Sequence, residues 1–134
     1  DVKNKAFYEK NYHLFLQKLD KLDAELKTIL APVKHKTFMV FHPSWGYFAA
    51  RYDLEQMPVE KEGKTPKPRE IVNLIKESKK HNIKVIFTAP QFSKKAANTI
   101  ARSIDGNIVI IDHLAYSYEK NLIDVAKAIY NSYK

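Results

Sequence analysis

The chain has 134 residues, 45% of them hydrophobic and 12% aromatic, so it forms one domain with a hydrophobic core, or one domain plus an appendage, and is not disordered. The absence of cysteine excludes disulfides, thiolate catalysis and cysteine-bound zinc. Its apolar runs fall far short of the roughly 20 residues that cross a bilayer, and its first residues lack the pattern of a signal peptide.

The charge is strongly basic, with a formal net charge of +8, yet the 23 basic residues include only three arginines. Arginine reads bases and phosphates better than lysine does. The lysines are spread along the whole chain, and no basic block with interleaved aromatic residues stands out. We therefore interpret them as a solvated surface and expect no nucleic-acid partner.

The first predicted element is a helix from about Asn4 to Leu30, because its apolar residues recur at alternating spacings of four and three. Pro32 ends it. The apolar stripe consists of Tyr8, Tyr12, Phe15, Leu19, Leu22, Leu26 and Ile29.

This helix is too long for its own domain. At 1.5 Å per residue it is roughly 40 Å long, whereas the rest of the chain has an expected radius of gyration of about 13 Å. We therefore divide the chain into a linker helix, 1–31, and a compact α/β lobe, 32–134. The projecting stripe indicates either self-association of the 1–31 helix or a helix that joins two lobes, one of which is absent from this chain.

After Pro32, strands alternate with helices, and the strands read as continuous apolar runs, which is typical of a parallel sheet covered on both faces. The predicted fold class is α/β, a four-stranded, mainly parallel sheet flanked by helices and preceded by one long amphipathic helix. The predicted strands are Thr37–Phe41, Leu54–Val59, Ile83–Phe87 and Ile108–Asp112; the predicted helices are Trp45–Arg51, Pro68–Lys80, Lys94–Ile104 (with Ser93 as its cap) and Ser117–Tyr133.

Ionisable residues stand at the ends of two of these strands. His42 follows the first strand, and Asp112 and His113 stand at the end of the fourth; we take them as the only strand-terminal ionisable groups. Because the carboxyl ends of parallel strands share one edge, where ligands bind, we expect these side chains to approach one another. An imidazole with a carboxylate suits zinc or a similar divalent ion, and it equally suits a hydrolase-type acid–base pair.

Each of these residues also has a purely structural interpretation. A strand-terminal histidine is more often a hydrogen-bonded structural residue than a ligand, and Asp112 can cap the turn that follows it. His113 is expected to be a loop residue or a neighbour of the site. We expect the aromatic residues of the short helix to belong to the core rather than to form a stacking platform; they are Trp45, Tyr47 and Phe48.

Three segments occur in order: HPSWGYFAARYDL, EGKTPKPREIVNLIKESKKHNIKVIFTAPQFSKKAANTIA and IVIIDHLAYSYEKNLIDVAKAI. The first resembles the third-histidine motif of the bacterial zinc and manganese ABC-transporter solute-binding proteins, the second resembles the stretch that follows it, and the third is similar to their closing segment. The first helix resembles the end of the long helix that joins the two lobes of that family. The resemblance covers essentially the whole chain without large gaps.

That family is a two-lobed metal receptor with two histidines in the N-terminal lobe and a histidine, often with carboxylates, in the C-terminal lobe. The resemblance assigns the third histidine to His42 and the strand-terminal aspartate to Asp112. The chain departs at Ala89, where many members have glutamate, and at His113, where they have proline. Without that glutamate, the donor set favours Zn²⁺ over the more oxygen-loving Mn²⁺.

The resemblance therefore implies a receptor without catalytic activity that captures a divalent metal ion between two lobes and delivers it to the membrane permease of an ABC importer. It implies a missing N-terminal lobe and a location in the periplasm or at the outer face of a bacterial membrane. The alternatives are a small α/β hydrolase or phosphoryl-transfer domain that uses His42 and Asp112 and, as the weakest, a lysine-rich nucleic-acid-binding domain.

Overall fold

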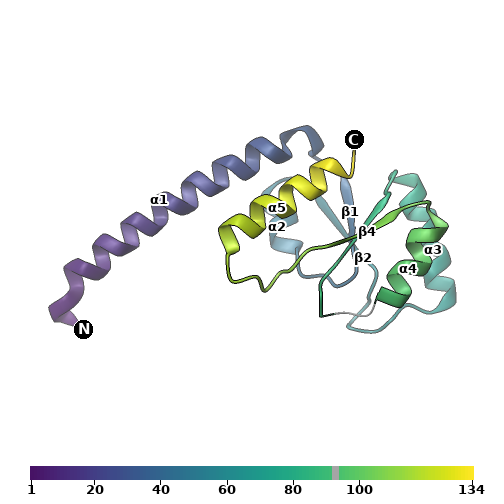
Figure 1. The fold of residues 1–134 in the computed structure, drawn as a ribbon, viewed down its shortest axis with the longest axis horizontal. Coiled ribbons are helices and arrows are strands. Elements are labelled where there is room, and N and C mark those ends of the chain that lie inside the picture. The colour runs from purple at the N-terminus through teal and green to yellow at the C-terminus, as the bar shows by residue number, and fades with distance from the viewer. Residues whose placement is uncertain (92–93) are drawn as a thin grey trace.

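The computed structural model describes residues 1–91 and 94–134 (Figure 1). Four strands form one parallel sheet in the spatial order β2-β1-β3-β4. The strands are β1 (Thr37–Val40), β2 (Glu55–Pro58), β3 (Val85–Thr88) and β4 (Asn107–Ile110); the α-helices are α1 (Lys5–Leu30), α2 (Gly46–Arg51), α3 (Pro68–Lys80), α4 (Lys94–Ser103) and α5 (Tyr118–Asn131), with short 3-10 turns at Val2–Asn4 and Ala31–Val33.

The predicted fold class is confirmed, and the element boundaries differ from the prediction by one or two residues. β1 ends at Val40 and β4 at Ile110. One further hydrogen bond follows each strand, from Phe41 N to the Phe87 carbonyl (2.7 Å) and from Ile111 N to the Thr88 carbonyl (2.9 Å). Two candidate ligands, His42 and Asp112, are thus each two residues beyond their strand; the predicted cap Ser93 lies outside the described residues.

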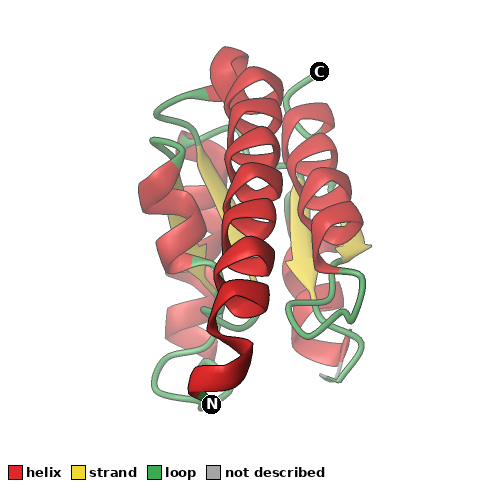
Figure 2. Cartoon of the chain, turned by 90° about the vertical axis from the view of Figure 1, so that its left-hand side faces the viewer, coloured by secondary structure: helices red, strands yellow, loops and turns green. Residues whose placement is uncertain are grey.

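Helices cover both faces of the sheet, as the buried central strands β1 and β3 require. Alternate strand residues point to opposite faces, so Phe38 and Val40 pack in one cluster while Met39 and Phe41 pack in the other. The first cluster lies under α1, α2 and α5, and α1 and α5 run side by side over it (Figure 2). The second lies under α3 and α4.

Helix α1 belongs to the lobe over only part of its length. Leu22, Leu26 and Leu30 are buried in the first cluster. Tyr8 and Tyr12, more than half exposed, lie on the half of the helix that extends away from the body (Figure 1). The prediction that the helix overshoots its lobe is confirmed.

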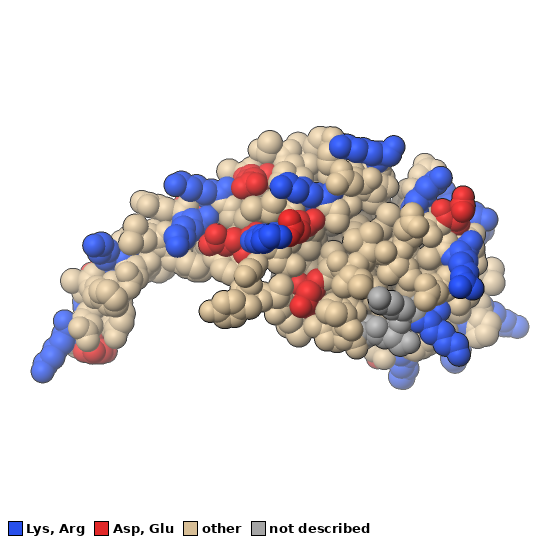
Figure 3. All heavy atoms as spheres, in the orientation of Figure 1, with Lys and Arg blue, Asp and Glu red and all other residues tan. Residues whose placement is uncertain are grey.

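No helix in the described residues combines the length and hydrophobicity that spanning a membrane demands. Charged side chains are scattered over the visible face, most of which is formed by other residues (Figure 3). Lysines and arginines are dispersed over it and alternate with carboxylates along α1 (Figure 3). This distribution agrees with a solvated lysine-rich surface.

Polar contacts centred on the Asp23 carboxylate hold α2 against α1. The Arg51 guanidinium donates to the Asp23 carboxylate from Nε (3.0 Å) and Nη2 (2.6 Å), and the Tyr52 hydroxyl donates to the same carboxylate (3.1 Å). Lys27 pairs with Asp23 from the same helix at 2.8 Å. Arg51 and then Lys27 hold the pKa of Asp23 well below its usual range, while burial and the Asp23 charge raise the pKa of Tyr52 to about 12.

Candidate functional site

The sheet order places its topological switch point between β1 and β3. The chain passes from β1 to β2 on one side and then crosses to β3 on the other side of β1. In open α/β sheets, ligands bind outside the carboxyl ends of the strands at such a switch point. His42 lies two residues beyond the end of β1, at this edge of the sheet.

The loop that carries His42 is fixed at several atoms. Pro43 has no N–H to extend the strand, and the next amide, Ser44 N, donates to the His42 carbonyl at 2.8 Å. Trp45 N donates to the Gln56 side-chain oxygen at 2.7 Å, which ties the loop to the neighbouring strand β2. These contacts fix the backbone of the loop that carries His42.

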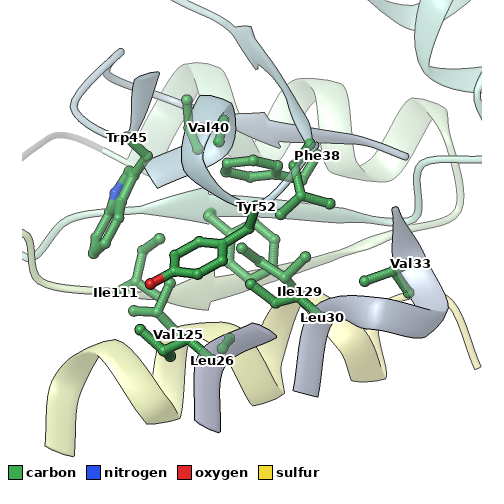
Figure 4. Close-up of a cluster of buried hydrophobic side chains, with 14 of the residues drawn as sticks. Leu26, Leu30, Val33, Phe38, Val40, Trp45, Tyr52, Ile111, Val125 and Ile129 are labelled. Carbon is green, nitrogen blue, oxygen red and sulfur yellow. The ribbon is translucent and has the colours of Figure 1, made fainter. Parts of the chain in front are cut away.

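Aromatic packing supports this loop from the first core cluster. Trp45 is buried, and its ring meets Phe48 edge-on with centroids 5.7 Å apart; Phe48 in turn lies 4.9 Å from Tyr52. Figure 4 shows Trp45 and Tyr52 within the cluster, above Ile111. The prediction that Tyr47 belongs to this core is wrong. Its side chain is 98% exposed, because the face of α2 that it occupies points away from the sheet.

A buried carboxylate that sequence analysis missed contacts His42. Glu60 is only 8% exposed, and its Oε2 lies 2.7 Å from His42 Nδ1. Glu60 follows β2 just as His42 follows β1, so the statement that His42, Asp112 and His113 are the only strand-terminal ionisable groups is wrong. The position of Glu60 directly after a predicted strand was the signal available in the sequence.

Asp112 makes a capping interaction of the kind that its structural interpretation predicted. Its Oδ1 accepts hydrogen bonds from Leu114 N (3.0 Å) and from the Gln91 side-chain amide (3.1 Å). The Asn121 amide donates to the Asp112 carbonyl at 2.7 Å. The Leu114 and Gln91 hydrogen bonds, with a smaller contribution from His113, lower the pKa of Asp112. The carboxylate is therefore oriented and favoured in its charged form, as a metal ligand must be.

His113 lies beside His42. Their ring centroids are 6.2 Å apart, with 31° between the ring planes. Ala89, one residue after β3, is buried and carries no donor atom on its side chain. Within residues 1–91 and 94–134, no three histidine, aspartate or glutamate side chains cluster closely enough to hold a metal ion. The close approach of His42 to Asp112 remains a prediction, although both side chains follow strands at the same edge.

Solved structures similar to this chain are about twice its length. A crystal structure of ZnuA superposes with a TM-score of 0.97 at 40% identity, covering 100% of this chain and 52% of that one. A zinc-bound ZnuA deletion mutant superposes with a TM-score of 0.92 at 41% identity, covering 98% of this chain and 51% of that one.

Sequence comparison agrees. The high-affinity zinc uptake system protein ZnuA of Bacillus subtilis (strain 168) is 32% identical over 116 residues, which are 85% of this chain and 36% of that protein. The chain therefore spans about half or less of the length of the relatives that it matches. The family model for zinc-uptake complex component A, periplasmic (ZnuA), matches residues 1–132. With nearly every residue matched, the chain belongs to the ZnuA family.

Proposed function

We propose that this chain is the C-terminal lobe, with the interlobe helix, of a receptor that captures Zn²⁺ between two lobes and delivers it to the permease of an ABC importer. The carrying observation is the superposition of the whole chain on only 52% of a solved ZnuA, at a TM-score of 0.97. The bare N-terminal half of α1 supports the proposal, because it leaves apolar surface for a further lobe.

The donor set of this lobe would be small. His42 supplies an imidazole nitrogen and Asp112 a carboxylate oxygen, and His113 offers a second imidazole 6.2 Å from the first. Ala89 supplies nothing. Zinc typically takes four ligands, with nitrogen and oxygen donors at about 2.0–2.2 Å, so the first lobe or water would complete the site. Imidazole donors favour zinc over manganese.

The location that fits this role is the periplasm or the outer face of a bacterial membrane. The family to which this chain belongs is that of a periplasmic component of zinc uptake. The receptor performs no catalysis: it holds an ion and releases it to a membrane partner.

A calorimetric zinc titration tests the proposal. The 134-residue chain alone should bind zinc weakly, because high affinity needs several deprotonated protein ligands in one geometry. The same chain joined to a first lobe should bind many orders of magnitude more tightly. Tight binding by the short chain alone would contradict the two-lobe proposal.

The ligand role of His42 is tested within the longer protein. His42→Ala should abolish tight zinc binding. His35→Asn is the matched control, because His35 precedes β1 at the opposite edge of the sheet and has a φ of 61°, which asparagine tolerates. If His42→Ala binds zinc as the unchanged protein does, the assigned site is wrong.

A further inference from the structure

The contact between His42 and Glu60 is short and shielded from solvent on the carboxylate side. The two atoms, His42 Nδ1 and Glu60 Oε2, are 2.7 Å apart, and the Glu60 side chain is 9% exposed whereas that of His42 is 37% exposed. A buried carboxylate is costly to maintain unless it is hydrogen-bonded. The buried Glu60 carboxylate therefore holds the more exposed His42 imidazole in place.

Backbone hydrogen bonds that continue the pairing of β1 with β2 position His42 and Glu60. Beyond the last paired residues of β1 and β2, Val59 N donates to the Val40 carbonyl (2.8 Å) and Glu60 N donates to the Phe41 carbonyl (2.9 Å). The segments that follow β1 and β2 thus continue side by side for two residues beyond the strands. Glu60 comes to rest beside His42 because of this register, and not through a flexible loop.

The chemistry of the pair fixes the imidazole. A carboxylate only accepts hydrogen bonds, so Nδ1 must carry the proton and donate it to Glu60. The lone pair of the neutral ring then lies on Nε2, the nitrogen on the far side of the ring from the carboxylate. We propose that Glu60 is a positioning residue that orients the His42 ring and selects the tautomer whose Nε2 binds the ion.

This inference rests on the proposed zinc-binding function and deepens it. Metal-ligating histidines commonly donate their second N–H to a carboxylate, which raises ligand basicity, and removing such a partner costs about 10–100-fold in metal affinity. Glu60 also adds a negative charge near the proposed site, in which Ala89 contributes neither a charge nor a donor atom. The carboxylate would therefore act through His42 without touching the ion.

Two substitutions separate the hydrogen bond from the charge. Glu60→Leu removes the acceptor, whereas Glu60→Gln keeps an oxygen that accepts from Nδ1–H and removes only the charge. Glu62→Gln is the matched control, since Glu62 is exposed, lies two residues further along the chain and changes the net charge equally.

Two quantities are measured on this chain joined to a first lobe. Nitrogen-15 NMR of labelled histidine reports which His42 nitrogen is protonated at a pH where the ring is neutral, with His42→Ala identifying the signals. Competition with a chromophoric chelator reports the zinc affinity. Amide spectra of each variant establish that the fold is retained.

We expect Glu60→Leu to move the proton from Nδ1 to Nε2 and to weaken zinc binding about 10–100-fold. Glu60→Gln should keep the tautomer and lose less affinity, and Glu62→Gln should change neither. An unchanged tautomer in Glu60→Leu, or unchanged affinity in both Glu60 variants, would overturn the inference and leave the proposed function standing. Unchanged zinc binding in His42→Ala would overturn both.

Discussion

At the scale of single residues, the candidate ligands at the carboxyl edge of the sheet also make hydrogen bonds within the fold. The Asp112 carboxylate caps the turn at Leu114 through Oδ1, and Glu60 is engaged with His42. Such anchoring and metal binding are compatible, because a carboxylate has two oxygens with about four acceptor positions. A ligand whose orientation is already fixed loses less freedom when the ion arrives.

The position of His113 leads to a first prediction. Two imidazoles that bind one zinc ion, each with a nitrogen at about 2.0–2.1 Å, need ring centroids about 5 Å apart, so the observed 6.2 Å requires only a small adjustment. His113→Asn should therefore weaken zinc binding by this chain joined to a first lobe, measured in a calorimetric titration, by less than His42→Ala does. An affinity equal to that of the control, His35→Asn, would show that His113 is a bystander.

The pKa of Asp23 leads to a second prediction, which concerns the junction of α1 and α2. Arg51 and Lys27 hold this pKa far below its usual value. A carboxyl whose pKa is lower in the folded than in the unfolded state stabilises the fold above the unfolded pKa, near about 4, and loses that contribution as the pH falls. Asp23→Asn should therefore be less stable at neutral pH and should lose less stability on acidification below about pH 4.

Urea unfolding at a series of pH values measures this effect. Asp20→Asn, an exposed position on the same helix, changes the charge equally and serves as the control. Parallel stability–pH curves for the wild type and Asp23→Asn would contradict the claim that the contacts of Asp23 stabilise the fold.

At the scale of elements, α1 provides a matched pair of leucines for a third prediction. Leu26 is 1% exposed in the core and Leu14 is 48% exposed on the projecting half. Leu26→Ala should lower the free energy of unfolding by about 2–5 kcal/mol, whereas Leu14→Ala should change it by no more than about 0.5 kcal/mol. Denaturant titration measures both; similar losses would mean that the projecting half is also packed in solution.

The sequence predicted the elements well because their signals are local. Apolar runs identified β1, β3 and β4, whereas β2, with the sequence EQMP, has no such run; spacings of three and four identified α1. Glu60 was missed because its approach to His42 depends on the register of β1 against β2, which pairs Val40 with Pro58. Tyr47 was misplaced because the rotation of a six-residue helix over a sheet is set by packing and not by periodicity.

The candidate site was predictable only in part. Because parallel strands all end at one edge of the sheet, the sequence places both His42 and Asp112 at that edge, as the structure does. The expectation that the strand-terminal side chains approach one another is confirmed for His42 and His113, whose ring centroids are 6.2 Å apart. The distance itself could not be predicted, because β3 separates β1 from β4 and the spacing depends on how the three strands pack.

At the scale of the whole molecule, the N-terminal half of α1 extends from the packed lobe with its apolar side chains exposed, and this leads to the last prediction. Phe7, Tyr8, Tyr12 and Phe15 are 47–61% exposed on α1. Burying a large apolar side chain contributes roughly 1.5–3 kcal/mol when burial is complete, so several such residues give a substantial drive to associate. In the absence of a covering lobe, we expect this 134-residue chain to form dimers, or assemblies that exchange α1, at high concentration.

Sedimentation velocity over a range of concentrations measures this association. The triple variant Tyr8→Gln, Tyr12→Gln and Phe15→Gln should shift the chain toward monomer, because glutamine preserves the helix and removes the apolar surface. The control replaces Tyr47 and Tyr116 with glutamine; these are 98% and 101% exposed and lie outside α1. Equal association in both variants would place the contact elsewhere. A strict monomer of the unchanged chain at high concentration would instead mean that the exposed stripe needs no cover, and would remove its support for a missing lobe.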